Sequence, residues 1–269
     1  MTGRVAGKVA FITGAARGQG RAHAIRLAEE GADIIAVDIL RDYDTVSYGM
    51  ASPEDLAETV KAVEALDRRI IASQADVRDA AALRAAVDDG VAQLGRLDIV
   101  SANAGICTVQ SWDEMTAAVW QDTLDTNLTG VWNTMVASVP HLIAAGGGSI
   151  ICTSSTAGLK GLPYFAPYVA AKHGVVGIAR TMANELARHH IRVNTVHPTG
   201  VDTPMGAGLG RLEALIDREP SLGPIYVNTL PVRAVDARDV SNAVLFLASD
   251  EARYVTGLEF TVDAGHTIR

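Results

Sequence analysis

The chain has 269 residues, of which 48% are hydrophobic and only 5% aromatic, and its formal net charge is −8. This length and this supply of aliphatic side chains suit one large α/β domain. The acidic balance, without any Lys/Arg-rich segment, argues against a nucleic-acid partner and against an anionic membrane surface. No apolar stretch reaches ~18 residues and the N-terminal segment lacks the apolar region of a secretory signal, so we expect no membrane span and a cytoplasmic location.

Short β-branched runs alternate with longer, alanine-rich amphipathic runs along the whole chain. Helices are clearest over 20–31 and over 52–67, where Ser52 can cap the start and Pro53 occupies the first turn. This alternation predicts a single Rossmann-type doubly wound domain over 1–269, with a mainly parallel seven-stranded sheet and helices on both faces. Strands are expected over 8–13, 33–38, 69–76, 97–105, 148–155, 191–198 and 258–265.

Two irregular stretches interrupt the alternation. Residues 39–51 form a polar insert after the second strand, and residues 203–231, rich in Gly and Pro, follow the sixth. Long irregular segments in a compact domain are usually binding loops or lids, although mobile surface loops have the same composition. Because 203–231 follows the carboxyl end of a strand, we expect a substrate lid there.

The sequence "TGAARGQG" joins the first strand to the first helix. Gly14 can make the tight turn, Gly18 lets the backbone approach a ligand, and Gly20 permits close helix packing. The helix start directs its free amides and positive dipole end at the loop, which suits a pyrophosphate. The strand before it and the helix and strand after it favour a dinucleotide site over a bare turn, and we include Arg17 and Gln19 in that site.

Asp38 ends the second strand, about 20 residues beyond the glycine loop, where an acid accepts hydrogen bonds from an adenosine ribose. A 2′-phosphate would meet the carboxylate there, which favours NAD. Arg17 points the other way, since a cation beside the loop could hold that phosphate. We expect NAD because Asp38 is fixed to a strand end whereas Arg17 can turn into solvent, and NADP is the alternative.

The sequence "YVAAK" places Tyr168 and Lys172 one helical turn apart on the same face. A phenol has a pKa of about 10, and a neighbouring ammonium lowers it toward the range useful for proton transfer. Ser155 follows the fifth strand, at the edge where ligands bind in such sheets, so its hydroxyl could bind a substrate oxygen. Ser154 is the alternative candidate for this role, and it would face the opposite side of the strand.

Together these features resemble the short-chain dehydrogenase/reductase family over essentially the whole chain. The resemblance implies that Tyr168 is the acid/base, that Lys172 binds the nicotinamide ribose and lowers the Tyr168 pKa, that Ser155 orients the substrate oxygen, and that Asn127 holds a water linking Lys172 to solvent. Further matches are "ADV" at 75–77, "NAG" at 103–105, "DTNLTG" around Asn127, and "HPTGVDTP" at 197–204.

The same resemblance implies the remaining cofactor contacts. The adenine would lie beside Asp76 and Val77, the length of the cofactor beside Asn103, Ala104 and Gly105, and the nicotinamide carboxamide beside Val201 and Thr203. The chain departs from the family in one place, where Pro198-Thr199-Gly200 replaces the usual Pro-Gly; the spacing to Val201 and Thr203 still fits.

The fuller string "TGAARGQGRAHA" and the insert 39–51 resemble one subgroup, the carveol-dehydrogenase-like, mycofactocin-associated enzymes. This implies a tightly held NAD that does not exchange freely and passes its electrons to mycofactocin, a peptide-derived carrier. The insert could cover the adenosine end; an ordinary loop with exchangeable NAD is the alternative. The family resemblance also implies a homotetramer, with a helix over 116–145 and the Tyr168 helix at subunit interfaces.

Other side chains carry weaker expectations. The histidines and the two cysteines show no metal-ligand spacing, so we expect no metal site. Tyr164, Met205, Leu209 and Leu212 could shape an apolar substrate pocket or simply pack. Three tryptophans, Trp112, Trp120 and Trp132, are expected to pack around the helix over 116–145.

The sequence therefore predicts an NAD-dependent enzyme that moves a hydride between nicotinamide and a secondary alcohol or ketone. The small-molecule substrate is expected to be apolar, with a terpenoid such as carveol as the model. An NADP-dependent carbonyl reductase and a non-catalytic NAD-binding regulator are the alternatives.

Overall fold

The computed structural model describes residues 3–269 as one parallel seven-stranded sheet of order β3-β2-β1-β4-β5-β6-β7, and this confirms the predicted fold class. Every neighbouring pair of strands is parallel. The strands are β1 (Val9–Thr13), β2 (Asp33–Asp38), β3 (Ile70–Gln74), β4 (Ile99–Ala102), β5 (Gly148–Thr153), β6 (Ile191–Pro198) and β7 (Glu259–Val262).

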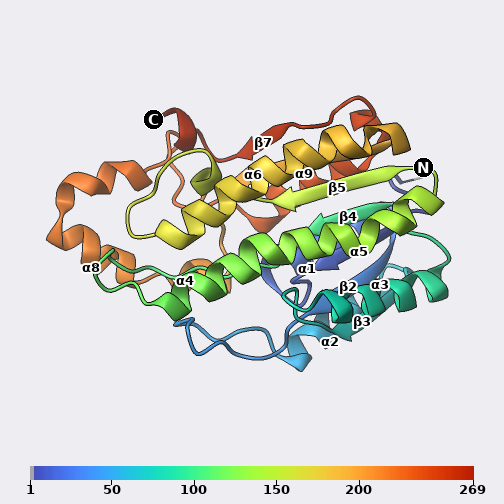
Figure 1. Cartoon of the computed structure of the whole chain (residues 1–269), viewed down its shortest axis with the longest axis horizontal. Helices are drawn as coiled ribbons and strands as arrows, with labels where there is room; N and C mark the ends of the chain where they lie inside the picture. Colours follow the sequence, from blue (N-terminus) through green and yellow to red (C-terminus); the bar gives the residue numbers. More distant parts are fainter. Residues whose placement is uncertain (1–2) are drawn as a thin grey trace.

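Helices cover both faces of the sheet (Figure 1). One face packs against α3 (Ala80–Leu94), α5 (Gly130–Ala144) and α6 (Ala166–Leu186), and the other against α1 (Gly18–Glu29), α2 (Pro53–Glu64) and α9 (Ala237–Ala248). Consecutive residues of β1 serve opposite cores, since Phe11 packs in the cluster with Leu83 and Ile12 in the cluster with Leu27. Burial on both faces explains why the strands are continuously apolar.

The helix expected over 116–145 is present but contains a wide turn. α4 (Ala117–Leu124) passes through the π-helical turn η1 (Asp125–Thr129) into α5. π-helical turns are rare in proteins, and those that occur often lie at functional sites. This one contains Asn127.

The expectation that the three tryptophans pack around this helix is wrong for the single chain. Trp112 is 89% exposed, and Trp120 and Trp132 are also exposed. Aliphatic side chains such as Met135 and Leu142 fill the inner face of α5, so the indoles lie on the outward surface.

The two irregular segments lie at the same end of the molecule, beyond the carboxyl ends of the strands (Figure 1). The insert 39–51 forms neither helix nor strand. The segment 203–231 is more regular than its composition suggests, with α7 (Pro204–Ala207), α8 (Arg211–Arg218) and the 3₁₀ turn η4 (Pro220–Tyr226). Between these segments the strand order reverses at β1 and β4, which is where ligands bind in open α/β sheets.

The remaining short turns complete the chain. They are the 3₁₀ turns η2 (Thr156–Gly158), η3 (Ala187–His189), η5 (Asp250–Ala252) and η6 (His266–Ile268). Over residues 3–269, no helix combines the length and the apolar character that crossing a bilayer requires.

Candidate active site

The backbone of the glycine loop requires its three glycines. Gly14 and Gly18 have φ values of +65° and +56°, in the left-handed region that side chains disfavour. A Cβ atom on Gly14 would lie 2.9 Å from the Cα of Ala104, and one on Gly20 only 1.9 Å from the carbonyl oxygen of Gly14. The loop is therefore packed tightly on itself and on the loop after β4.

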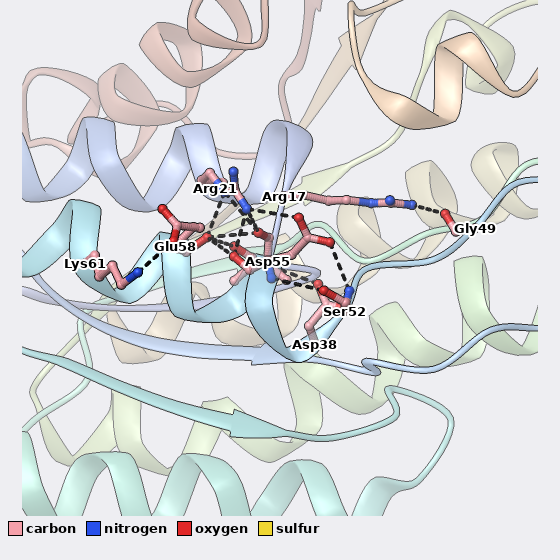
Figure 2. Close-up of polar contacts among 11 residues, drawn as sticks. Arg17, Arg21, Asp38, Gly49, Ser52, Asp55, Glu58 and Lys61 are labelled. Atoms are coloured by element: carbon pink, nitrogen blue, oxygen red, sulfur yellow. Dashed lines mark hydrogen bonds and ion pairs between the residues drawn. The ribbon is translucent and has the colours of Figure 1, made fainter.

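Side chains from α1 and α2 hold the carbonyl groups of this loop (Figure 2). Arg21 donates to the carbonyl oxygen of Ala16 at 2.6 Å and to that of Asp55 at 2.7 Å, and the Thr59 hydroxyl lies 3.1 Å and 3.0 Å from the carbonyl oxygens of Ala15 and Ala16. No side chain of the described residues caps the start of α1. Its first amides are therefore available to an anionic group, which fits a pyrophosphate.

Asp38 lies against the same loop. Its Oδ2 accepts a hydrogen bond from the Ala16 amide at 2.9 Å and its Oδ1 accepts one from the Ile39 amide at 2.8 Å. Burial raises the pKa of this carboxyl, and the backbone hydrogen bonds oppose the rise. Each carboxylate oxygen has a further lone pair, so Asp38 can hold the loop and still accept from a ribose hydroxyl.

The insert closes over the loop at Arg17. The guanidinium of Arg17 donates to the carbonyl oxygen of Gly49 (Figure 2). The sequence suggested that Arg17 can turn into solvent; in the structure the insert supplies an acceptor for it. The resulting cleft is lined by Gly14, Arg17, Gly18, Gln19, Gly20, Asp38, Met50, Ala51, Asn103, Ala104, Gly105, Thr203, Pro204 and Met205.

Five residues predicted to contact the cofactor do not line this cleft: Asp76, Val77 and Val201, together with Tyr168 and Lys172, which are described below. Asp76 forms ion pairs with Arg41 at 2.9 Å and Arg78 at 2.7 Å. Val77 is buried against α5, where a Cβ on Gly130 would lie 2.5 Å from it. Val201 is buried in a β-bridge, whereas Thr203, two residues later, lines the cleft. The contacts of Asp76, Val77 and Val201 with a cofactor stay predictions. The partner of Val201 in that bridge is Val235.

The loop after β4 is fixed from both sides. The amides of Asn103 and Ala104 donate to the Thr13 hydroxyl at 3.0 Å and 3.1 Å. The Asn127 side chain accepts from the Ile106 amide at 2.8 Å and donates to the Ile106 carbonyl at 2.7 Å. These two hydrogen bonds fix the Asn127 side chain, and the water that the resemblance assigns to Asn127 stays a prediction.

The structure brings Ser155, Tyr168 and Lys172 together. Lys172 is 2% exposed, donates to the Thr153 carbonyl at 2.7 Å and lies 5.4 Å from the centre of the Tyr168 ring. Ser155 hydrogen-bonds to Tyr168 and thereby favours the phenolate. Ser154 faces away from this group, as predicted, because its hydroxyl donates to the Lys172 carbonyl at 3.1 Å inside the core.

Burial dominates the titration of this group. It raises the pKa of Tyr168 above its ordinary value and lowers the pKa of Lys172 to about 8. The predicted lowering of the Tyr168 pKa is therefore wrong for the chain itself, since desolvation of the phenolate outweighs every favourable neighbour. Only the Ser155 hydrogen bond acts in the predicted direction.

His197 is a site residue that sequence reasoning missed. It is fully buried, and its Nδ1 lies 2.9 Å from the Ser155 carbonyl oxygen while its Nε2 lies 2.6 Å from the Thr195 hydroxyl. A carbonyl can only accept, so Nδ1 carries the proton. Burial lowers the pKa of His197, which keeps the ring neutral, with Nε2 accepting from Thr195. The available signal was its position at the end of the strand next to that of Ser155.

An apolar cluster adjoins Tyr168 and contains the residues predicted to form pocket walls. Its buried members include Cys107 and Leu215, the latter from the lid helix α8. The segment predicted as a lid therefore packs beside Tyr168. Packed against the buried members are Leu162, Tyr164, Tyr168, Val169, Met205, Leu209, Leu212 and Tyr226. Over residues 3–269, no group of three or more His, Cys, Asp or Glu side chains is arranged to hold a metal ion.

Known proteins share this architecture over their full length. The family model described as enoyl-(acyl carrier protein) reductase matches residues 14–267. The (−)-trans-carveol dehydrogenase of Rhodococcus erythropolis is 50% identical, with 99% of each chain covered. The crystal structure of a carveol dehydrogenase from Mycobacterium avium in complex with NAD is 54% identical, covers 100% of both chains and has a TM-score of 0.94.

A further crystal structure, of a short chain dehydrogenase from Mycobacterium paratuberculosis bound to NAD, is 50% identical with a TM-score of 0.96 and covers 99% of this chain and 100% of that one. The resemblance to carveol dehydrogenases is thereby confirmed. At these identities, and with both partners matched nearly end to end, the chain belongs to the short-chain dehydrogenase/reductase family.

Proposed function

We propose that the protein is an NAD-dependent dehydrogenase that interconverts secondary alcohols on apolar rings, such as carveol, and the corresponding ketones. The observation that carries this proposal is the convergence of Ser155, Tyr168 and Lys172 beside an apolar cluster closed by α8. The relatives named carveol dehydrogenase support the substrate class. An intact catalytic set of this kind does not support a purely regulatory NAD-binding protein.

The chain's own residues would each do one part of the reaction. The glycine loop would hold the pyrophosphate and Asp38 the adenosine ribose, while bound NAD would supply the hydride acceptor. Ser155 would donate a hydrogen bond to the substrate oxygen, and the Tyr168 oxygen would take the hydroxyl proton as the carbinol hydride leaves. Lys172 would bind the nicotinamide ribose and, once charged, lower the Tyr168 pKa that burial raises.

NAD is favoured over NADP by the surroundings of Asp38. The carboxylate is fixed at the cleft by two backbone amides, so a 2′-phosphate there would meet its negative charge. Arg17, the cation that could have offset this repulsion, already donates to Gly49. The neighbouring crystal structures that hold NAD add to this preference.

We further propose that the NAD is retained between turnovers and reoxidised in place by an external carrier such as mycofactocin. This proposal is supported by the insert 39–51, because its Met50 lines the cleft and its Gly49 carbonyl accepts a hydrogen bond from Arg17. A cytoplasmic homotetramer is part of the same proposal. Trp132, Val136 and Ile143 expose apolar surface along α5, where the family resemblance places a subunit interface.

The test is turnover of carveol by purified protein, with NAD and an artificial electron acceptor both present. Replacing Tyr168 by Phe should abolish turnover while the nucleotide released on denaturation is still NAD, in wild-type amount. Unchanged turnover by this variant would contradict the mechanism, and recovery of NADP would contradict the cofactor assignment.

A further inference from the structure

Tyr48 lies where three functional segments meet. It belongs to the insert 39–51, one residue before the Gly49 carbonyl that binds Arg17. Its hydroxyl oxygen accepts a hydrogen bond from the Cys107 amide at 3.1 Å, so it is also attached to the loop that follows β4. Neither contact follows from the sequence, because both partners are far from Tyr48 along the chain.

The third contact is with the lid. A Cβ atom on Gly208 would lie 2.6 Å from Cδ1 of Tyr48 and 2.7 Å from both its Cβ and its Cγ. Contact with Cβ and Cγ involves the part of the side chain nearest the backbone, which a rotamer change moves little. Tyr48 therefore packs against the lid at Gly208, where a larger residue would clash with it.

These contacts lead to the reacting group. Cys107 is buried in the apolar cluster that includes Tyr168, together with Met205 and Leu209 of the lid. Tyr48 and Cys107 are both near enough to influence the pKa of Tyr168. Tyr48 therefore touches the cover of the nucleotide cleft, the lid and the wall of the substrate pocket at once.

The base of the insert is anchored elsewhere and does not depend on Tyr48. The Tyr43 hydroxyl pairs with that of Thr126 at 3.0 Å, and the Thr45 hydroxyl donates to Asp122 at 2.7 Å. A change at Tyr48 should therefore loosen the tip of the insert while its base stays attached to the helix that contains η1.

We propose that Tyr48 is a positioning residue that joins the nucleotide cover to the substrate lid, so that the nucleotide leaves only when the lid also moves. This inference rests on the proposed function, because it takes NAD as the bound nucleotide. The inference adds a specific coupling to the proposed function. A change at Gly208 of the lid, which does not contact the glycine loop, should alter the rate of nucleotide release.

Two glycines of the lid provide a matched test. Gly208 and Gly210 both have right-handed backbone conformations, with φ of −75° and −57°, so alanine suits either backbone. Only at Gly208 would the new Cβ meet Tyr48, since a Cβ on Gly210 has no atom within 4 Å among the described residues. The readout is the rate at which NADH fluorescence is lost when NADH-loaded protein is mixed with excess NAD.

Gly208→Ala should release NADH about tenfold faster than wild type, which corresponds to about 1.4 kcal/mol of the barrier. Gly210→Ala should stay within about twofold of wild type, as expected for a change that meets no neighbour. Because Tyr48 fixes the pocket wall, Gly208→Ala should also raise KM for carveol more than it lowers kcat. Equal release rates in the two alanine variants would overturn the proposal.

A second pair of variants keeps the test decisive if Gly208→Ala folds poorly. Tyr48→Ala alone should speed NADH release, and adding Gly208→Ala to it should have no further effect because the clash is gone. Effects that simply add would overturn the coupling. NADH release is measured without any alcohol, so failure of the proposed substrate class would leave this result standing. Failure of the coupling would in turn leave the proposed dehydrogenase reaction standing.

Discussion

Replacement of His197 examines how the active site is held in place. His197→Leu keeps the side-chain volume close to that of His but removes the donor that lies 2.9 Å from the Ser155 carbonyl. The Ser155 carbonyl still accepts a hydrogen bond from the Gly158 amide at 2.8 Å, so the change removes one of its two hydrogen bonds, at a cost of about 0.5–1.5 kcal/mol. Thr195 loses its partner as well, but its hydroxyl can turn to the Leu258 carbonyl 3.4 Å away, so we attribute most of the loss to Ser155.

The catalytic consequence should exceed the effect on stability. A shift of ~1 Å in a group that orients the substrate can cost about 10²-fold in rate, so kcat for carveol should fall by that order while KM changes less. His197→Asn places an amide N–H near the position of Nδ1 and should recover most of the lost kcat. Steady-state kinetics normalised to folded protein, with urea unfolding of each variant, measure both effects.

The comparison of the two substitutions separates positioning from general destabilisation. A merely structural role would make kcat follow stability in both variants. If His197→Leu keeps wild-type kcat, or if His197→Asn is no better than His197→Leu, then His197 does not position Ser155 and the reasoning fails.

Two further predictions concern charge in the cleft. Burial lowers the pKa of Lys172 from 10.5 to about 8, so between these two pH values the unfolded chain binds more protons than the folded one. The free energy of unfolding should therefore rise by about 3 kcal/mol from pH 8 to pH 10.5 relative to Lys172→Met, and this gain should be lost again as pH falls from 10.5 to 8. Parallel pH profiles of the two proteins in urea unfolding would contradict this. Asp38→Ala should weaken NAD binding by about tenfold or more, because the adenosine ribose loses its proposed acceptor and the Ala16 and Ile39 amides that shape the loop lose theirs. The variant should also have a smaller preference for NAD over NADP. Calorimetric titration with both nucleotides measures both effects, and an unchanged preference would remove Asp38 as the discriminating group.

The parts of the site that follow local rules were predictable from the sequence. Glycines 14, 18 and 20 are required by turn geometry and close approach, and both can be read from one short segment. Ser154 turns into the core, as strand alternation led us to expect, although β5 already ends at Thr153. The helical spacing of Tyr168 and Lys172 placed them on one face, as the structure has them.

What was missed depends on contacts between distant segments. His197 acts on Ser155 across two neighbouring strands, and Tyr48 meets Cys107 and Gly208 only because an irregular insert folds over the cleft. The pKa of Tyr168 was misjudged for a related reason. The sequence shows which charged groups are near in the chain, whereas the degree of burial that decides this pKa depends on the assembled fold.

The engagement of Ala15 and Ala16 by Arg21 and Thr59 has a consequence for selectivity at the nucleotide cleft. With these oxygens already engaged, the groups left free for an incoming molecule are chiefly the uncapped N–H groups at the start of α1. Such a surface favours a phosphate group and provides few partners for a cation or for a neutral ligand that has few hydrogen-bond acceptors. Arg21 and Thr59 would thus influence which ligands bind in the cleft, although neither needs to touch the ligand.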